Sequence, residues 1–228
     1  MSLTGAGAAA ALLLAASVAA AQIPPGPEEL RAYRGLHAAA ARDDAAEVGR
    51  LLAAGANPEA RDGQGRTALH VAAFTSHVAA ARALVAGGAQ PNALDAQRYD
   101  IVTIAAVKND VAMLRLALAL GASAGNVTSP YDGTALIAAA HLGHDEAVRE
   151  LIRGGAPLDH VNNLGWTAVL EAVILGDGGP RHVAVLRALV EVGADPGLPD
   201  RQGVTPREHA ERRGYAEMVA ILASARRR

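Results

Sequence analysis

The 228-residue chain has a nearly balanced charge, with 21 basic and 23 acidic residues, and 51% of its residues are hydrophobic. This balance excludes the basic footprint of a nucleic-acid-binding domain, and an aromatic content of 3% is too low for a base-stacking platform. Because cysteine is absent, disulfides, thiolate metal sites, a cysteine nucleophile and a lipoprotein anchor are excluded as well.

Residues 1–21 have the features of a signal peptide. No side chain in this stretch is charged, and its apolar segment ends in Ala19-Ala-Ala21, small residues that suit signal-peptidase cleavage after Ala21. The segment is too short and too rich in alanine to be predicted as a membrane span, so none is expected to remain after cleavage. We predict a periplasmic or secreted protein. The lack of Lys and Arg before the apolar segment leaves a cytoplasmic location open, with residues 1–21 as an alanine-rich leader.

Residues 22–33 are predicted to form a linker followed by a capping helix. Pro24 and Pro25 begin a new segment, and Pro27 opens a short helix with two glutamates in its first turn. Acidic residues are favourable at that end of a helix. We expect the helix to cover the open amino-terminal face of the next domain.

Residues 34–225 contain a motif that returns with a period of about 33 residues. The copies begin at Arg34, Thr67, Asp100, Thr134, Thr167 and Thr205, with spacings of 33, 33, 34, 33 and 38 residues. A period in this range predicts a solenoid, whose function resides on an extended surface rather than in one catalytic pocket.

Each copy predicts two helices and a turn. The clearest one, Thr67-Ala-Leu-His-Val-Ala-Ala73, opens with a hydroxyl that can cap a helix and continues with small apolar residues. A polar break and a second apolar helix follow, ending in Gly-Ala, where glycine can adopt the left-handed conformation. A polar stretch of about ten residues then leads to the next copy as a turn or hairpin.

This unit resembles the ankyrin repeat, with its Thr-Pro-Leu-His-like opening and Gly-Ala close. The copy at Asp100 departs from the pattern, because it lacks the Thr, the His and the preceding Gly, which is replaced by Arg98. The resemblance implies an all-α ankyrin-repeat solenoid over residues 34–225, with about six helix–turn–helix repeats joined by β-hairpin-like loops. It also implies that a partner protein binds on the concave face and the hairpin tips.

The eight histidines do not predict a catalytic or metal site. The resemblance implies that His37 and His70, at the fourth motif position, and His144, between two helices, are structural. His141 and His144 could supply two zinc ligands, but no third ligand is evident. We therefore predict no catalytic residue, no metal, no cofactor and no small-molecule substrate.

Four of the six aromatic residues are predicted to lie on the partner-binding surface. The resemblance places Tyr99 and Trp166 at hairpin tips, Tyr131 in a nearby longer loop and Phe74 in the concave groove. Large rigid aromatic side chains are favoured anchors at interfaces. The alternative is that these rings only pack against neighbouring hairpins. Polar neighbours predicted on the same surface are Arg66, Gln97, Lys108, Asp132, His141 and Asn163.

The 38-residue spacing has its extra residues at positions 176–182, between the two helices of the fifth repeat. An insertion there is expected to emerge as a loop, from which Asp177 and Arg181 could contact a partner. The alternative, which we favour slightly, is that its glycines and Pro180 simply stop one helix and start the next. Residues 226–228 are predicted to be a solvated basic tail.

The predicted function is a non-enzymatic protein–protein interaction module that binds an unidentified partner protein. Two alternatives stay open: a structural or self-associating scaffold and, ranked below it, an enzyme or metal-binding protein built on the solenoid.

Overall fold

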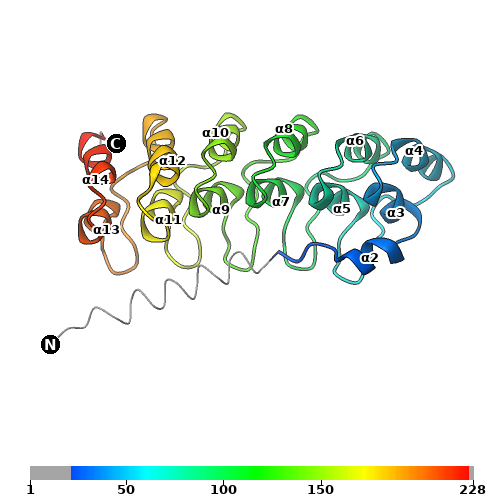
Figure 1. The fold of residues 1–228 in the computed structure, drawn as a ribbon, viewed down its shortest axis with the longest axis horizontal. Helices are drawn as coiled ribbons and strands as arrows, with labels where there is room; N and C mark the ends of the chain where they lie inside the picture. The colour runs from blue at the N-terminus through cyan, green and yellow to red at the C-terminus, as the bar shows by residue number, and fades with distance from the viewer. Residues whose placement is uncertain (1–21, 226–228) are drawn as a thin grey trace.

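The computed structural model describes residues 22–225, so the predicted signal peptide of residues 1–21 and the basic tail of residues 226–228 lie outside the described residues. The described chain forms helices stacked side by side in two rows (Figure 1). The first row contains α3 (Gly35–Ala41), α5 (Ala68–Thr75), α7 (Ile101–Val107), α9 (Ala135–His141), α11 (Ala168–Ile174) and α13 (Pro206–Arg213). The second row contains α4 (Ala45–Ala53), α6 (Val78–Ala86), α8 (Val111–Ala119), α10 (Asp145–Arg153), α12 (Pro180–Glu191) and α14 (Ala216–Ser224). A short helix, α2 (Pro27–Ala32), contacts α3 at the amino-terminal end. The fold is the all-α repeat solenoid that the sequence predicts.

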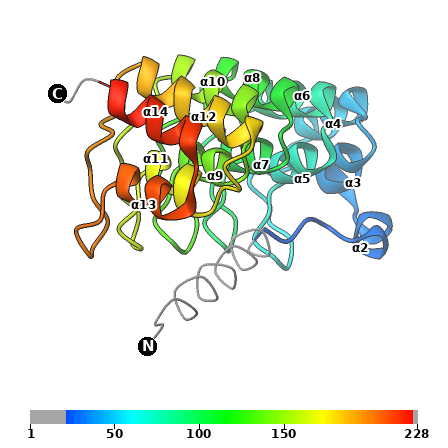
Figure 2. The same ribbon diagram turned by 60° about the vertical axis from the view of Figure 1, so that its left-hand side comes forward.

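The loops between repeats project beyond the first row of helices (Figure 2). Each is closed by a backbone hydrogen bond between its two arms. These N–H···O bonds, of 2.7 to 3.0 Å, join Asp62 to Arg66, Asp95 to Tyr99, Thr128 to Gly133, Asn162 to Trp166 and Asp200 to Val204. Within residues 22–225 the pairing extends to one isolated antiparallel bridge, Thr128 with Gly133, so the loops are hairpin-like turns.

Threonine and aspartate side chains begin the first-row helices. Thr134, Thr167 and Thr205 each accept a hydrogen bond from the backbone N–H three residues further on, at 3.2 to 3.4 Å. Asp100, in the irregular third repeat, accepts the same bond from Thr103 at 2.8 Å. An N-cap acceptor satisfies one of the amides that a helix start leaves unpaired. Asp100 therefore keeps the cap that the missing threonine would provide.

The second-row helices from α4 to α12 are each followed by a glycine in the left-handed conformation. Gly88, after α6, has φ of +97°, and the N–H of Ala89 returns to the carbonyl of Leu84 at 3.0 Å. A residue with a Cβ is strained at this φ, so glycine is favoured where the chain turns into the loop.

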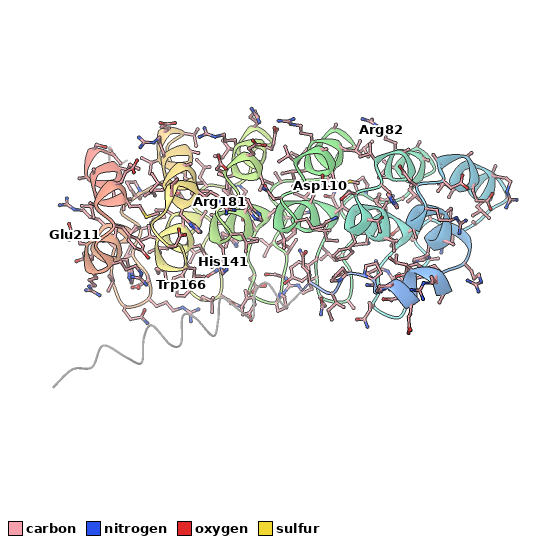
Figure 3. The ribbon with its side chains drawn as sticks, in the orientation of Figure 1. Arg82, Asp110, His141, Trp166, Arg181 and Glu211 are labelled. Atoms are coloured by element: carbon pink, nitrogen blue, oxygen red, sulfur yellow. The ribbon has the colours of Figure 1, made fainter. Side chains whose placement is uncertain are left out.

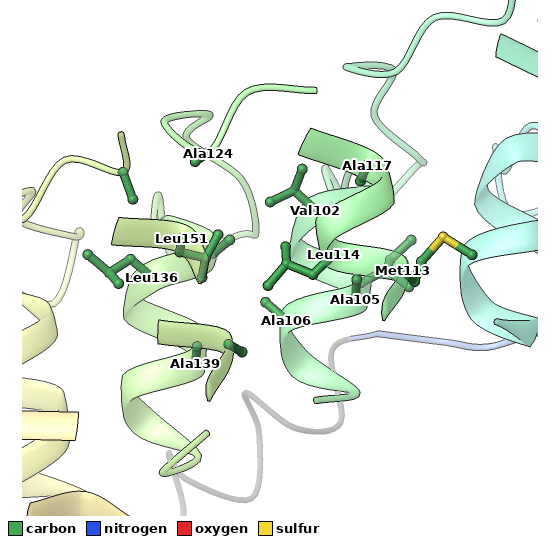
Figure 4. Packing of buried hydrophobic residues seen from close by; sticks show 14 of the residues in the cluster. Val102, Ala105, Ala106, Met113, Leu114, Ala117, Ala124, Leu136, Ala139 and Leu151 are labelled. Atoms are coloured by element: carbon green, nitrogen blue, oxygen red, sulfur yellow. The ribbon is translucent and has the colours of Figure 1, made fainter. Parts of the chain in front are cut away.

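Small side chains let neighbouring repeats pack closely (Figure 4). Ala105, Ala106 and Ala139 are completely buried between α7 and α9, and Leu114 and Leu151 are completely buried in the second row. Alanine brings helix backbones near one another, while leucine fills the wider space between rows. The high alanine content of the sequence is thus a property of the repeat interfaces.

A polar side chain near the junction of each repeat's two helices bonds to the end of the preceding repeat's first helix. Carbonyls at a helix end have no intrahelical partner, and a positively charged or N–H-bearing side chain stabilises them. Five such contacts, with N···O distances of 2.5 to 3.2 Å, join His77 to Ala40, Lys108 to Phe74, His144 to Ala106, His182 to His141 and Arg213 to Ile174. We call these five contacts the carbonyl ladder.

The structure corrects the predicted surface position of Arg66, which is completely buried beneath the amino-terminal segment. Its guanidinium pairs with Asp62 at 2.7 Å and with Glu29 of α2, and it donates a hydrogen bond to the Ile23 carbonyl at 2.9 Å. A buried charge needs charged and hydrogen-bonding partners. Arg66 therefore attaches the amino-terminal segment to the first hairpin and is unavailable to a partner.

Candidate partner-binding surface

Two of the predicted aromatic anchors are buried rather than exposed. Tyr99 is 2% exposed and Phe74 is 8% exposed. Burial, aided by the nearby Asp95 carboxylate, raises the pKa of Tyr99 to about 12. The Tyr99 carbonyl closes its hairpin and also lies 3.1 Å from His70 Nε2, which holds the residue against the stack. The sequence predicts that these two rings are exposed to a partner, but both pack inside the solenoid instead.

Tyr131 and Trp166 are half-buried, so part of each ring reaches the surface. Trp166 lies on the hairpin side of His141 (Figure 3). The Trp166 carbonyl accepts the Asn162 N–H that closes the fourth hairpin, while Tyr131 lies in the longer loop between α8 and α9. Part of each side chain is therefore exposed on the hairpin side of the stack.

The polar residues predicted on this surface divide into two groups. Asp132 and Asn163 lie on hairpins, where Asp132 pairs with Arg98 at 2.9 Å and the Asn163 side chain donates to Pro130 O at 3.0 Å. Gln97, on the same side, is half-buried. The Lys108 ammonium donates to the Phe74 carbonyl at 2.5 Å, and desolvation lowers the pKa of Lys108. Lys108 therefore belongs to the carbonyl ladder, although its side chain is exposed at the surface of the stack.

Neighbouring hairpins are bonded to one another along the stack. Backbone N–H groups of Ala96, Ser129 and Asn163 donate to carbonyls of the adjacent hairpin at 2.9 to 3.1 Å. Arg201 of the last hairpin donates to the Asn163 carbonyl. This cross-bonding holds the hairpin tips in a fixed order, so a partner would meet a preorganised edge.

A pocket lies where the first-row helices α7, α9 and α11 meet the second, third and fourth hairpin loops. Its apolar wall includes Val107, Ile137 and Leu164 together with the two tyrosines discussed above. We call it the concave pocket, lined by Gln22, Tyr99, Thr103, Val107, Thr128, Ser129, Tyr131, Gly133, Thr134, Ile137, Ala138, His141, Asn162, Leu164 and Glu171. An apolar cavity with a few converging polar groups is typical of a binding site.

A buried polar cluster forms one end of the concave pocket. Glu171, 3% exposed, accepts a hydrogen bond from the Asn162 side chain at 2.9 Å, and its second oxygen lies 3.1 Å from His141 Nδ1. The His141 ring, 7% exposed, is turned toward Glu171, not toward His144, whose Nδ1 lies 3.0 Å from the Ala106 carbonyl. The cluster orients the imidazole and gives the pocket an acidic end.

Sequence reasoning missed Glu171, Asn162 and Gln22 as members of this pocket. A signal for Glu171 exists, because the other repeats have Ala, Val, Ile or His at its motif position and it alone is acidic. Gln22 precedes the repeats and carries no motif, so only the folded chain reveals its contact.

The insertion of the fifth repeat is a short loop plus a longer helix, since α12 starts at Pro180 and is 12 residues long. Asp177 accepts bonds from Gly179 N–H at 2.8 Å and lies 2.9 Å from His182 Nδ1, and the Tyr215 hydroxyl donates to Gly176 O at 3.0 Å. The loop is thus held by the sixth repeat as well as by its own. Asp177 is exposed on this loop, and Arg181 is exposed in the first turn of α12.

Within residues 22–225 no group of three or more His, Asp or Glu side chains is placed to hold a metal ion. Over the same range, no helix has the length and apolar character needed to cross a membrane.

Comparison with known proteins settles the family. The family model described as ankyrin repeats (three copies) matches residues 12–95, 36–126 and 102–200. The chain belongs to the ankyrin-repeat family. Ankyrin repeats are generally protein–protein interaction modules, and proteins of this family are typically non-enzymatic scaffolds.

Individual ankyrin-repeat proteins resemble the chain over different lengths. The ankyrin repeat protein YahD of Escherichia coli K12 is 38% identical over 101 residues, which is 44% of this chain and 50% of YahD. A crystal structure of an ankyrin repeat domain from Acinetobacter baumannii is 42% identical, with a TM-score of 0.78 over 82% of this chain and 95% of that one. The crystal structure of EF0377, an ankyrin repeat protein, is 30% identical with a TM-score of 0.78, over 85% of this chain and all of EF0377. The chain thus spans half of YahD and nearly all of both solved structures.

Proposed function

We propose that this ankyrin-repeat protein binds a partner protein through the concave pocket and the adjoining hairpin tips, without catalysing a reaction. The observation that carries the proposal is the concave pocket itself, an apolar cavity with the His141–Glu171–Asn162 cluster at one end and half-buried Tyr131 on its wall. Apolar pockets surrounded by polar rims are where interface energy concentrates.

The proposed binding surface contains fewer residues than the sequence predicts. The proposed surface keeps Tyr131, Trp166, Asp132 and Asn163, and Tyr99 lines its pocket. Phe74 and Arg66 are buried, and the Lys108 ammonium is bonded to the Phe74 carbonyl. His141 contributes from within the pocket. Gln97 is half-buried on its hairpin, and Asp177 and Arg181 are exposed between the fifth repeat's two helices, outside the lining of the concave pocket. The preorganised hairpins favour binding because little ordering entropy is lost.

The test is affinity purification with pocket variants. We expect Tyr131→Ala combined with Leu164→Ala to lose the partners retained by the wild-type chain, because both side chains form the apolar wall. Arg82→Ala is the matched control, since Arg82 lies exposed on α6 in the second row, far from the hairpins (Figure 3). If the double variant folds and keeps every partner, the pocket is not the binding site.

We also propose that the chain is exported, on the strength of the uncharged apolar stretch before Gln22. Amino-terminal sequencing of the protein from its native cell should then start at Gln22. A chain that retains residues 1–21 in the cytoplasm would contradict export without affecting the binding proposal.

A further inference from the structure

The amino-terminal segment, residues 22–26, reaches from α2 to the concave pocket. It runs along the hairpin side of the stack toward α7 (Figures 1 and 2). Arg66 holds its middle by donating to the Ile23 carbonyl at 2.9 Å, and Pro25 is buried beside it. Gln22 then enters the lining of the concave pocket and is 9% exposed. The chain therefore places one of its own extended segments on the surface proposed for a partner.

Gln22 lines the concave pocket without completing its hydrogen bonds. With Gln22 in place, the cavity measures about 30 Å³, room for only about two water molecules. The Gln22 amide nitrogen, Nε2, is buried and has no hydrogen-bond partner. An unpaired buried donor weakens the contact that contains it. A ligand that filled the same space and paired its own polar group would bind more favourably than Gln22.

We propose that residues 22–26 form a displaceable cis strap over the concave pocket, and that the partner inserts an extended segment with a neutral amide side chain in its place. This inference rests on the proposed function and deepens it. An intramolecular occupant competes at a high effective concentration, so partner binding is weakened until the strap leaves.

The chemistry of the pocket favours a neutral occupant over an acidic one. Its walls are apolar, and the Glu171 carboxylate lies at one end with both oxygens hydrogen-bonded. A second carboxylate would meet like charge in a poorly hydrated space, whereas an amide of the same shape would not. Replacing Gln22 by Glu should therefore release the strap with almost no change in side-chain size.

The first experiment measures strap docking in the full 228-residue chain. Because the sequence has no cysteine, Ile23→Cys with Val161→Cys, both at exposed positions, allows two spin labels to be attached selectively. We expect one narrow distance distribution in the parent pair and a broad one after Gln22→Glu. Adding Glu171→Gln should narrow it again. Gln64→Glu places the same charge on an exposed hairpin and should leave the distribution unchanged. An unchanged distribution in Gln22→Glu would overturn the strap.

The second experiment measures access to the pocket with a fluorescein-labelled, acetylated peptide of residues 22–26. The Gln22→Glu chain should bind this peptide about tenfold more tightly than the wild-type and Gln64→Glu chains do. A peptide with Glu in place of Gln should bind the Gln22→Glu chain about tenfold more weakly. Equal affinity for the wild-type and Gln22→Glu chains, or equal binding of both peptides, overturns the proposal.

The two proposals fail in different ways. If the Tyr131 and Leu164 variants abolish partner binding but Gln22→Glu leaves the distances and peptide affinity unchanged, only the cis strap is wrong. If the strap is released and the peptide binds, yet the pocket variants keep all partners, the proposed partner site is wrong.

Discussion

At the scale of single residues, burial decided which polar and aromatic side chains are structural. Arg66 and Tyr99 follow loop sequences that the repeat pattern places at the surface, yet each is almost completely buried. Arg66 pairs with Glu29, which is 37 residues away in sequence, and the Tyr99 carbonyl contacts His70, which is 29 residues away. The repeat motif alone does not predict which segments bury these two residues.

Removing the buried guanidinium should be costly. Arg66→Met leaves Asp62 without its buried cation, so we expect a loss of about 3–5 kcal/mol in the free energy of unfolding, measured by urea denaturation. Arg98→Met is the control, because Arg98 and Asp132 form an exposed pair, and its cost should stay below about 1 kcal/mol. Similar losses in the two variants would contradict the structural role assigned to Arg66.

One buried histidine, His70, and one half-buried histidine, His144, should make stability depend on pH. Desolvation lowers the pKa of His70 and of His144 below 6.5 in the folded chain. The unfolded chain then binds protons that the folded chain does not, so stability is full above about pH 6.5 and falls as the pH drops below it. For His70 the slope should approach about 1.4 kcal/mol per pH unit, with a smaller share from His144.

The pH effect can be measured as the urea midpoint between pH 7.5 and pH 5. His70→Gln should lower stability at neutral pH, because the bonds to Thr67 and Tyr99 are changed. Between neutral pH and pH 5, the stability of this variant should decline less than that of the wild-type chain. A midpoint that rises on acidification would show that the histidines prefer the charged form in the folded chain.

At the scale of elements, local sequence accounts for where most helices begin and end. A threonine or aspartate opens each first-row helix from α5 onward, and a left-handed glycine follows each second-row helix from α4 to α12. The carbonyl ladder is less visible in sequence, because its five members are three histidines, one lysine and one arginine. They share a position in space, set by the stacking of one repeat on the next, rather than a residue type.

The ladder should contribute to stability at each interface. Lys108→Met removes the donor to the Phe74 carbonyl while preserving the length of the side chain, so we expect a loss of about 1.5–3 kcal/mol in urea unfolding. Arg82→Met, on the exposed face of α6, should change stability by less than about 0.5 kcal/mol. A neutral Lys108→Met variant would mean that water satisfies these carbonyls equally well.

At the scale of the whole molecule, each repeat contacts only its neighbours along the stack (Figure 1). Stability in such a solenoid is close to a sum of repeat and interface contributions. The two ends differ: Arg66 attaches α2 over the first repeat, whereas α13 at the other end buries only Pro206 and Ala210.

This asymmetry predicts graded local unfolding. In native-state hydrogen exchange, amides of α13 and α14 should exchange through a low-energy opening, while those of α7, α9 and α11 should exchange last. Arg66→Met should speed exchange in the first repeat and leave the last repeat unchanged. Uniform exchange rates along the stack would indicate a single cooperative unit instead.

The sequence by itself determined the family fold, the number of repeats and the structural use of His70 and His144, because these follow from short-range patterns repeated in register. It also placed the candidate surface near the hairpins of the third to fifth repeats. Only the tertiary structure showed that Arg66, Tyr99 and Phe74 are buried, that Glu171 and His141 meet, and that Gln22 reaches their pocket. Each of these depends on contacts between segments about 30 or more residues apart. Local propensity depends only on neighbouring residues, so it does not predict which distant segments will pack together.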